Sequence, residues 1–449
     1  MDTSTIGINS LDKNIMPITA KINSQGALEI GGCNTIELAQ EYGTPLYIID
    51  EATLQENCFN YIKSLRSYFK DFLVLYASKA FCSTAILNLV NNYGMGIDVV
   101  SGGELYAALK AKVNNENIYF HGNNKSYDEI EFAIKSNIGK FVCDNFHELN
   151  LIDVISQKLN KKVKVLIRFT PGIECHTHEY IKTGHLDSKF GFDLEYFDQV
   201  IADIKSKPNI TLVGLHGHIG SQIFEIKPYL DLLEIYMEKI YKLKNEHQLE
   251  IKELNIGGGI GISYTNTDDP FTIDDWAQAI SKKLNELTQK YNLNTPKIIC
   301  EPGRSIVGPS GVTLYTVGNV KNIPEVRKYI AVDGGMADNP RPITYQAKYS
   351  CLIANKAQQK DTEVVTIAGR YCESGDILIK DISLPPITTG DILAVFSTGA
   401  YNYSMSSNYN MVPKPACILV KNGKSNLIIK RETYSDVIKK HIIPQENHS

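Results

Sequence analysis

A lysine ends one apolar run of the sequence, "FLVLYASK" at residues 72–79. An apolar run of this length is typical of a buried strand, so Lys79 stands where that strand should end. Such a lysine is either a solvated strand terminus or an amine placed for chemistry. Apolar neighbours and nearby cationic groups favour the neutral, nucleophilic form of an amine. Lys79 is therefore a candidate for covalent chemistry with a carbonyl group.

Three consecutive glycines, Gly257, Gly258 and Gly259, occur in "NIGGGIG" at residues 255–261. Such a loop can turn its backbone N–H groups toward an anion, and a phosphate is the usual ligand. A tight turn without a ligand explains the same residues equally well. The dinucleotide-binding pattern GxGxxG is a weaker alternative, because the sequence has no acidic ribose partner at the expected distance.

Other residues could complete a phosphate site and bind more than the phosphate. Ser221 in "HIGSQ" offers a hydroxyl group, and Arg304 in "EPGR" offers a guanidinium group. Glu301 suits a basic ring nitrogen that must stay protonated. His218 could stack on a flat ring, although a buried histidine with a structural role is the simpler interpretation. Together with Lys79, these residues predict pyridoxal 5′-phosphate, a flat phosphorylated ring with a basic nitrogen and an aldehyde.

A metal site is an alternative for the segment "IECHTHEYIKTGHLDSKFG" at residues 173–191, which contains Cys175, His176 and His178. The remaining ligands of a zinc site are missing at the usual spacing. We therefore predict no metal and expect this segment to be a loop near the mouth of the active site.

Three further segments carry residues that could bind an amino-acid substrate. Arg341 and Tyr345 lie in "DNPRPITYQAKY", Cys372 and Glu373 in "CESGDIL", and Tyr401 in "GAYNYS". Each residue could be an ordinary surface or core residue. Taken together, an arginine and a tyrosine suit a carboxylate, a glutamate suits an ammonium group, and a nearby thiol could donate a proton.

Eight short apolar runs, separated by segments with helical spacing, form the middle of the chain. The runs lie at residues 72–79, 96–101, 117–123, 140–145, 163–170, 211–220, 253–259 and 297–304. Near-continuous apolar strands that alternate with helices are typical of a parallel sheet covered by helices. Eight such units match the size of a (β/α)8 TIM-like barrel.

Polar residues or glycines end almost every one of these runs. They include Lys79, Asp98, His121, Asp144, Arg168, His218, Gly257–Gly259 and Glu301. In a (β/α)8 barrel the carboxyl ends of the strands converge on the face that carries the active site. Strands often end at polar loop residues, but this explains less well why lysine, acids, histidines and arginine all occur there.

The sequence after Arg304 is β-rich, with glycine-containing turns and no long helical segment. Strand-like pieces also occur in "GALEIGG" and "TPLYIID" within the first 50 residues. We expect a fold of the α/β class: residues 51–304 form the barrel that binds the cofactor, and residues 25–50 and 305–449 form a second, mostly β domain. Residues 1–24 are expected to be a loose N-terminal extension.

The composition is that of an ordinary globular protein, with 449 residues, 43% of them hydrophobic, and a net charge of −4. This charge does not favour binding to nucleic acid or to an anionic membrane. The sequence shows no secretion signal and no apolar run of the roughly 20 residues that span a bilayer. Nine cysteines without a CxxC pair indicate reduced thiols and a cytoplasmic location.

These motifs, in this order, resemble the diaminopimelate decarboxylases, a family of fold-type III, alanine-racemase-like pyridoxal phosphate enzymes. The resemblance covers about residues 25–435 and rests on "YASKA", "HTHEYIKTG", "SKFG", "HGHIGSQ", "GGGIGI", "EPGRSIV", "MADNPRPITY", "CESGDIL" and "GAYNYSMSSNYN". It implies decarboxylation of meso-2,6-diaminopimelate at its D-centre to L-lysine and carbon dioxide, the last step of lysine biosynthesis.

The resemblance also implies a role for each motif residue. Lys79 bonds to the cofactor, and Cys372 is a second catalytic residue. Cofactor contacts are implied for Asp98, His218, Ser221, Gly257, Gly258, Gly259, Glu301, Gly303, Arg304 and Tyr401. Substrate contacts are implied for Arg304, Arg341, Tyr345, Glu373 and Tyr401. Family knowledge further implies a homodimer in which Cys372 and Glu373 come from the partner subunit.

Three other functions are compatible with parts of the sequence. The nearest is a related decarboxylase of ornithine, lysine, arginine or carboxynorspermidine. An alanine-racemase-like isomerase fits "CESGD" and "SKFG" less well. A catalytically dead regulator of a decarboxylase is disfavoured because Lys79, Cys372, Glu301 and the glycine run are all retained.

Overall fold

The computed structural model describes residues 14–173 and 188–444, which form two compact units. The barrel unit comprises Leu54–Ser263 and Asp268–Gly308. The β unit comprises the described residues up to Thr53, Tyr264–Thr267 and the described residues from Pro309 onward. The chain thus crosses between units after Thr53 and after Gly308, a few residues beyond the expected boundaries, and the short Tyr264–Thr267 excursion was not expected.

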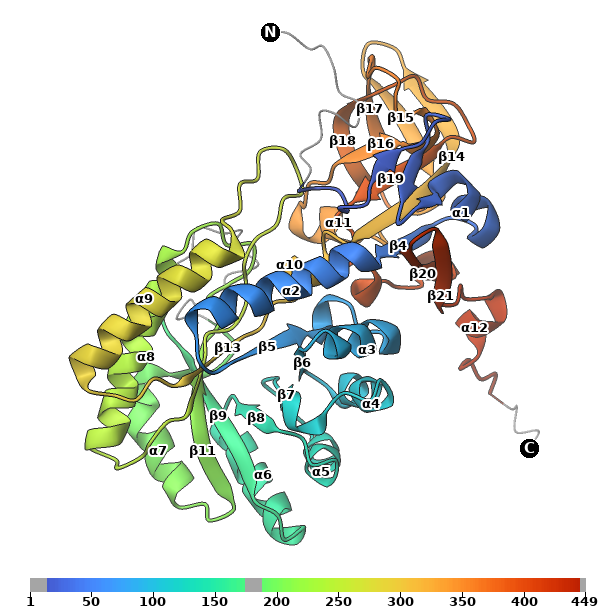
Figure 1. Ribbon diagram of the computed structural model, residues 1–449. Coiled ribbons are helices and arrows are strands. Elements are labelled where there is room, and N and C mark those ends of the chain that lie inside the picture. Colours follow the sequence, from blue (N-terminus) through green and yellow to red (C-terminus); the bar gives the residue numbers. More distant parts are fainter. Residues whose placement is uncertain (1–13, 174–187, 445–449) are drawn as a thin grey trace, which may run out of the picture. The chain divides into compact units, whose positions relative to one another are not determined.

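Eight parallel strands close into a barrel in the barrel unit (Figure 1). They are β5 (Phe72–Ala77), β6 (Gly96–Val99), β7 (Ile118–Phe120), β8 (Lys140–Cys143), β9 (Val163–Thr170), β11 (Ile210–His216), β12 (Glu253–Asn255) and β13 (Lys297–Cys300). Each strand pairs with the next, and β13 pairs with β5 to close the ring, while the short β10 (Phe192–Asp193) adds to β9. The expected barrel is confirmed, and each of its strands lies within or overlaps one of the eight apolar runs.

Helices connect the strands and surround them (Figure 1). They are α2 (Glu51–Tyr68), α3 (Thr84–Asn92), α4 (Gly102–Lys110), α5 (Tyr127–Lys135), α6 (Phe146–Lys158), α7 (Phe197–Lys205), α8 (Lys227–Asn245), α9 (Ile273–Tyr291) and the short α10 (Arg304–Val307). Side-chain caps fix several helix starts: Ser83, Ser101 and Ser126 each accept a hydrogen bond from the first turn of α3, α4 and α5.

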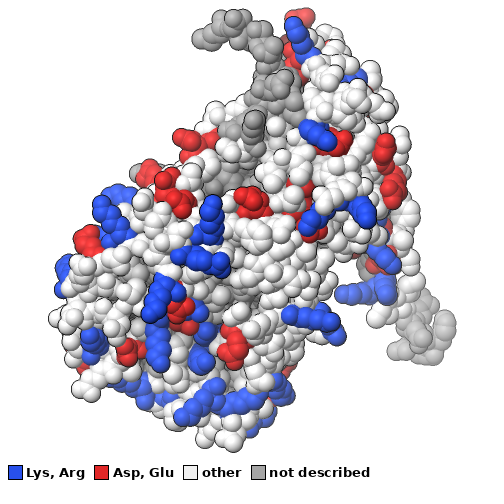
Figure 2. All heavy atoms as spheres, in the orientation of Figure 1, with Lys and Arg blue, Asp and Glu red and all other residues white. Residues whose placement is uncertain are grey.

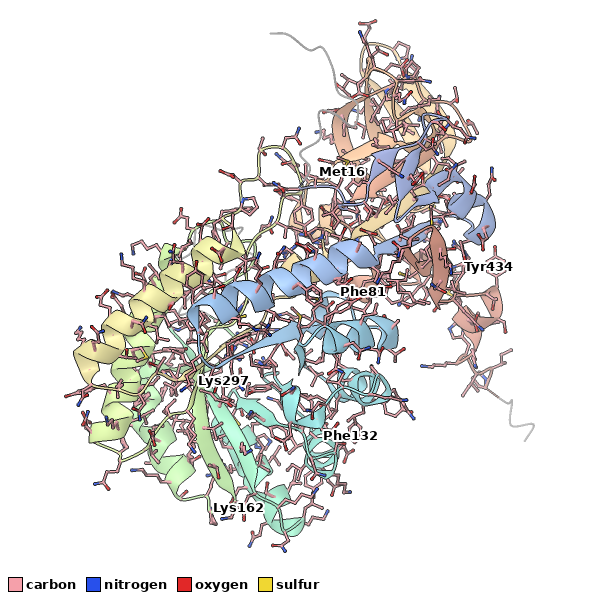
Figure 3. The ribbon with its side chains drawn as sticks, in the orientation of Figure 1. Met16, Phe81, Phe132, Lys162, Lys297 and Tyr434 are labelled. Carbon is pink, nitrogen blue, oxygen red and sulfur yellow. The ribbon has the colours of Figure 1, made fainter. Side chains whose placement is uncertain are left out.

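The inside of the barrel is filled by apolar side chains, with Leu75, Tyr119, Val142, Leu166 and Ile299 in one buried cluster. Figure 3 labels Lys162, just before β9, and Lys297, the first residue of β13, which mark the amino ends of two barrel strands. This packed interior leaves the carboxyl ends of the strands as the face on which a site can form.

The β unit is built mainly from one branched sheet. Its order is β18-β17-β15-β14-β4-β20-β21, and β19 joins β14 to β16. The bounds are β4 (Leu46–Asp50), β14 (Gly311–Ile323), β15 (Arg327–Val332), β16 (Cys351–Ile353), β17 (Glu363–Ala368), β18 (Ile377–Leu384), β19 (Ile392–Phe396), β20 (Ala416–Lys421) and β21 (Lys424–Ile429). Because β4 pairs with both β14 and β20, the N-terminal and C-terminal segments share one sheet, as expected.

Smaller elements complete the β unit. They are β1 (Lys21–Ile22), β2 (Leu28–Ile30), β3 (Cys33–Asn34), α1 (Thr35–Tyr42), α11 (Arg341–Tyr345) and α12 (Tyr434–Ile438). Residues 14–24 pack with this unit, whereas the sequence suggested a loose extension. Ile15 and Met16 are buried in its apolar core, and β1 pairs with β2. This segment packs against the β unit because burying the side chains of Ile15 and Met16 removes apolar surface from water.

Lysines and arginines lie interspersed with acidic side chains on the face drawn in Figure 2, in keeping with the small net charge. Within the described residues, no helix combines the length and the hydropathy that crossing a bilayer requires. The cytoplasmic location stays a prediction.

Candidate active site

Five polar residues meet inside the mouth of the barrel, each at or just after the carboxyl end of a different strand. We call Asp98, His121, His216, Asn255 and Glu301 the Glu301 cluster. They come from β6, β7, β11, β12 and β13, and all five side chains are buried. Parallel strands in register therefore bring together residues that are far apart in the sequence.

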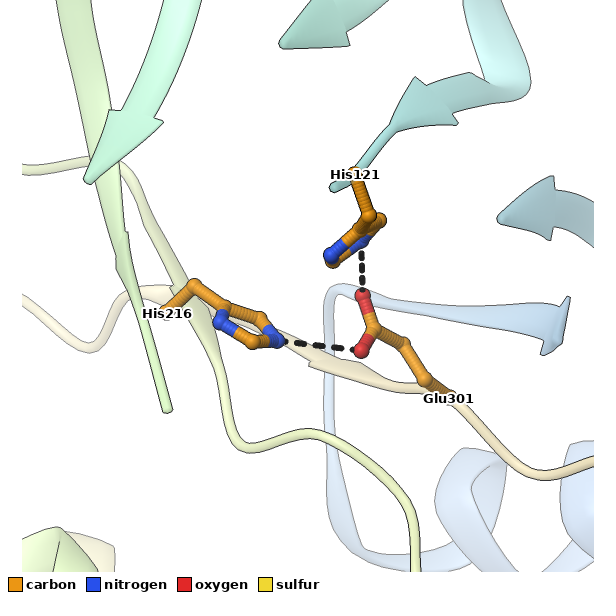
Figure 4. Close-up of side chains that lie close together, drawn as sticks. All are labelled: His121, His216 and Glu301. Atoms are coloured by element: carbon orange, nitrogen blue, oxygen red, sulfur yellow. Dashed lines mark hydrogen bonds and ion pairs between the residues drawn. The ribbon is translucent and has the colours of Figure 1, made fainter. Parts of the chain in front are cut away.

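The carboxylate of Glu301 lies between two imidazole rings (Figure 4). Its Oε1 atom is 2.8 Å from His121 Nε2 and accepts a hydrogen bond of 2.6 Å from Asn255 Nδ2. Its Oε2 atom is 3.0 Å from His216 Nε2. Both oxygens are thus held, and the carboxylate has a fixed orientation.

The cluster favours an ionised Glu301. Burial alone would raise the pKa of Glu301, but the charges and hydrogen bonds of His121 and His216 hold that pKa well below its usual value. Burial lowers the pKa of His216 to about 4. Burial also acts to lower the pKa of His121, yet the charges of Asp98 and Glu301 outweigh it and raise that pKa. Of the two histidines, His121 is therefore the one whose surroundings favour the positively charged form.

The glycine run lies beside this cluster, after the seventh barrel strand. Gly257 and Gly259 have φ angles of +70° and +107°, a region that favours glycine. A Cβ atom at Gly258 would collide with the backbone oxygen of Glu301. The N–H group of Gly257 donates to Asn255 Oδ1 at 3.0 Å, so the run is tied directly to the Glu301 cluster.

Three more predicted residues lie in the neighbouring loops, with His218 and Ser221 after the sixth strand, β11. Arg304, after the eighth strand, donates through Nη2 to Ser221 Oγ at 2.8 Å. His218 accepts a hydrogen bond at Nδ1 from the Gly258 N–H at 3.3 Å. Burial, followed by the charge of Lys79, lowers the pKa of His218 well below its usual value. The loops after the seventh and eighth strands are the place where TIM barrels commonly bind phosphate.

Lys79 lies in a 3₁₀ turn, Ser78–Ala80, directly after β5. Its side chain is exposed, whereas Ser78 and Ala80 are buried. The N–H group of Ala77 donates to the backbone oxygen of Pro302 at 3.0 Å, and Gly303 packs against Ala77 and Ala80. The lysine thus stands at the rim of the barrel, beside the loop that carries Glu301.

The remaining predicted residues belong to the β unit. Arg341 begins α11, is buried, and donates through Nη1 to Tyr349 Oη at 2.6 Å. Tyr345 and Tyr401 are half-buried, and Tyr401 has a φ angle of +62°. Cys372 and Glu373 are exposed.

A buried aspartate that the sequence did not single out organises these β-unit loops. Asp376 accepts hydrogen bonds from the N–H groups of Met336 at 2.6 Å and Tyr371 at 2.9 Å. Gly335 and Gly369 leave room for its carboxylate, because a Cβ atom on either glycine would press against it. Asp376 therefore joins the segment leading to Arg341 to the loop that carries Cys372.

Sequence reasoning singled out Lys79, Glu301 and the glycine run as candidates, but it missed most of the side chains that contact Glu301. His121 counted only as a polar strand end, and His216 and Asn255 were not named. One signal was available: each of these residues lies at or just after the end of an apolar run, as Glu301 does. Cys175, His176 and His178 lie outside the described residues, and the expected loop there stays a prediction.

His121, His216 and Glu301 could also hold a metal ion, because two imidazoles and a carboxylate are common ligands. Metal-bound histidines normally hydrogen-bond through their second ring nitrogen. His216 Nδ1 has no hydrogen-bond partner among the described residues. The observed distances are those of hydrogen bonds to Glu301, and the absence of a metal stays a prediction.

A family model and several relatives of known name are similar to this chain over most of its length. The pyridoxal-binding domain of the pyridoxal-dependent decarboxylases matches residues 54–308. Diaminopimelate decarboxylase of Synechocystis is 48% identical over 97% of this chain and 94% of its own length. The Bacillus subtilis enzyme of that name is 46% identical over 94% of this chain and 96% of its own length.

This chain belongs to the diaminopimelate decarboxylase family. A crystal structure of the family member from M. jannaschii superposes with a TM-score of 0.89 at 37% identity, covering 95% of this chain and 98% of that one. The resemblance inferred from the sequence motifs is confirmed.

The barrel residues fit the pyridoxal phosphate that the family uses. Arg304 donates to Ser221, and the glycine run packs against the backbone just before Ser221 with φ angles that favour glycine. Glu301 is a buried carboxylate held ionised, which suits a protonated ring nitrogen. The Oδ1 atom of Asp98 and the Nδ1 atom of His216 are buried and lack hydrogen-bond partners among the described residues, so the cluster has bonding capacity to spare.

Proposed function

We propose that this chain decarboxylates meso-2,6-diaminopimelate at its D-centre and releases L-lysine and carbon dioxide, with pyridoxal 5′-phosphate as cofactor. The observation that carries this proposal is the buried carboxylate of Glu301 held between His121 and His216, in a barrel mouth that also presents Lys79 and the glycine run. A relative from M. jannaschii has been crystallised in complex with L-lysine, the product that this reaction would release.

The barrel residues would bind the cofactor. We assign the phosphate to Gly257–Gly259, Ser221, Gly303 and Arg304, and the flat ring to His218. We assign Glu301, with Asp98 near it, to the ring nitrogen, and Lys79 would supply the amine for covalent attachment. When bound, pyridoxal phosphate accepts the electron pair that the departing carboxylate leaves behind.

Glu301 would act by keeping the ring nitrogen protonated. A carboxylate with a lowered pKa stays ionised, and an ionised partner favours the protonated form of a basic nitrogen. His121, His216 and Asn255 prevent the carboxylate from turning away, which is the preorganisation that electrostatic catalysis needs.

Five residues are assigned to the substrate, as the resemblance implies. Arg304 and Arg341 suit its carboxylates, Tyr345 and Tyr401 add hydroxyl groups, and Glu373 suits the distal ammonium group. Gripping the distal L-centre would align the bond that breaks, so binding energy is used for orientation. Tyr401 is also assigned to the cofactor.

Cys372 or Lys79 would return a proton to the carbon that has lost carbon dioxide. Cys372 and Glu373 are exposed within their own unit, which supports a homodimer in which these two residues reach the active site of the partner subunit.

The test is direct. Purified protein with pyridoxal phosphate is incubated with meso-diaminopimelate, and L-lysine and carbon dioxide are quantified. Ornithine, lysine, arginine and carboxynorspermidine serve as alternative substrates, and racemised product is measured in parallel. We expect one lysine per carbon dioxide from diaminopimelate and at least about a hundredfold lower kcat/KM for the others. A preference for another substrate, or racemisation without carbon dioxide, would refute the proposal.

A further inference from the structure

His121 faces two buried carboxylates with a single nitrogen. Its Nε2 atom lies 2.8 Å from Glu301 Oε1 and 3.7 Å from Asp98 Oδ1. His216 contacts Glu301 from the other side, at Oε2 (Figure 4). The two histidines therefore hold Glu301 in similar ways but differ in their relation to Asp98.

The backbone around His121 is fixed by buried polar contacts. The N–H group of His121 donates to the backbone oxygen of Val99, beside Asp98, at 2.8 Å. In the loop that follows, Lys125 Nζ donates to the backbone oxygens of Gly122 and Val142 at 2.8 and 3.0 Å and pairs with Glu148 at 2.6 Å. These contacts keep the imidazole between the two carboxylates.

Two buried carboxylates in one pocket repel each other and lose the solvation of water. Burial raises the pKa of Asp98 to about 6, even though the charge of His121 acts to lower it. The pKa of Glu301 moves the opposite way, because His121 and His216 outweigh its burial. A positive charge on His121 therefore favours the ionised form of Glu301. The same charge also favours the ionised form of Asp98, although burial opposes it.

The other charged groups around this pair come from several elements. Arg168 on β9, Lys79 after β5 and Glu104 on α4 all act on Asp98, His121 or both, and the neutral His216 and Asn255 contact Glu301. Arg168 is a permanent cation, and its charge acts to lower the pKa of His121. Among these groups, His121 is the one whose ring lies near the carboxylates of both Asp98 and Glu301.

We propose that His121 is a positioning residue whose positive charge lets Asp98 and Glu301 occupy the same pocket and keeps Glu301 ionised and turned toward the cofactor ring. The identity of the ring rests on the proposed function, whereas the coupling among His121, Asp98 and Glu301 belongs to the protein alone. The role requires a charge, so a neutral side chain that only preserves a hydrogen bond cannot replace it.

The test compares His121→Gln with the matched variant His216→Gln, each with Asp98 intact and in combination with Asp98→Asn. The affinity for pyridoxal phosphate is measured by equilibrium dialysis from pH 6 to 9. With Asp98 intact we expect His121→Gln to weaken binding by about ten- to a hundredfold at neutral pH. In the Asp98→Asn background we expect most of this loss to disappear, whereas the loss from His216→Gln should remain the same in both backgrounds.

A second measurement works without the cofactor. The imidazole protons of the apoprotein are titrated by NMR, and His121→Gln identifies the resonance of His121. We expect Asp98→Asn to lower the pKa of His121, because the group that stabilises its charged form is gone. A failure of the proposed cofactor would abolish the dialysis signal but leave this titration intact.

Two results would overturn the proposal. One is an equal loss of affinity from His121→Gln with and without Asp98, which would reduce His121 to a hydrogen-bond donor. The other is a His121 titration that Asp98→Asn leaves unchanged. His121→Asn is a second neutral variant, and thermal unfolding confirms that each compared protein is folded.

Discussion

The two units present their candidate residues in opposite ways. In the barrel unit, Asp98, His121 and Glu301 are buried and approach one another at the carboxyl ends of the strands. In the β unit, Cys372 and Glu373 lie exposed in one loop. The difference teaches that one chain organises the barrel cluster alone, whereas the same chain leaves the two residues of the β-unit loop in water.

The same contrast holds for the carboxylates. Glu301 is fixed by three side chains and is kept ionised by its neighbours, so its charge is available in a fixed direction. Glu373 is exposed, and ion pairs in water contribute little. If Glu373 binds an ammonium group tightly, the ion pair must form in an environment that excludes water.

The largest effect is expected from Lys79→Ala in the barrel unit. The variant should lose carbon dioxide release by about a thousandfold or more, because it lacks both covalent attachment and a proton-transfer group. Carbon dioxide release from diaminopimelate is the measurement, and Lys110→Ala on the exposed side of α4 is the control. Turnover at the wild-type rate in Lys79→Ala would remove the lysine from the chemistry.

The next effect concerns the direction of the barrel carboxylate. Glu301→Gln should lower kcat by about a hundredfold and change KM much less, because the glutamine cannot hold a ring nitrogen protonated. Steady-state kinetics measures this split. Glu253→Gln, which changes a barrel carboxylate paired with Lys140 at 3.1 Å outside the cluster, is the matched control. An unchanged kcat in Glu301→Gln contradicts the role.

Mixing inactive variants tests whether the two units act across two chains. When Lys79→Ala and Cys372→Ala proteins are dissociated, mixed equally and reassociated, about a quarter of the wild-type activity should return, because each mixed dimer regains one intact site. Lys79→Ala mixed with Glu301→Gln should show no such recovery, since each barrel of the mixed dimer then carries one damaging change. No recovery in the first mixture would place Cys372 in the site of its own chain.

The smallest effect is a difference in the pH dependence of stability. Burial raises the pKa of Asp338 in the β unit to about 7, although a hydrogen bond from Tyr315 opposes it. An unfolded aspartate titrates near 3.9, so Asp338 stabilises the fold at low pH and loses this contribution as the pH rises from about 4 to 7. Glu301, with a lowered pKa, behaves in the opposite way: its contribution is present above about pH 4.3 and is lost as the pH falls.

Asp338→Asn should therefore flatten the fall of the unfolding free energy between pH 5 and 7 by up to about 1.4 kcal/mol per pH unit. Urea unfolding at several pH values measures it. Thr344→Ala, on the exposed side of α11, is the control and should retain the wild-type slope. A slope unaltered by Asp338→Asn would mean that Asp338 is ionised throughout.

The sequence predicts the parts of this molecule that local patterns determine. Apolar runs followed by helical spacing identify all eight barrel strands, and alternating short strands after Arg304 identify the β unit. Lys79 and Glu301 could be found because each follows an apolar run. The fixed partners of Glu301 could not be derived, since the contact between His121 and Glu301 depends on how the barrel closes.

Local signals also fail where long-range packing decides. Ile15 and Met16 lie in a segment with no regular pattern, yet they are buried against strands that are distant in sequence. In the sequence, Asp376 is one more polar residue of "CESGD". Its hydrogen bonds with the N–H groups of Met336 and Tyr371 form only when distant loops fold together.

The central claim is that the barrel mouth binds the aldehyde of pyridoxal phosphate through Lys79. The most direct measurement is borohydride reduction of the protein loaded with the cofactor, followed by proteolysis and mass spectrometry of the labelled peptide. We predict one pyridoxyl group per chain, attached to Lys79. A label on another lysine, or no label on the wild-type protein, would contradict the account.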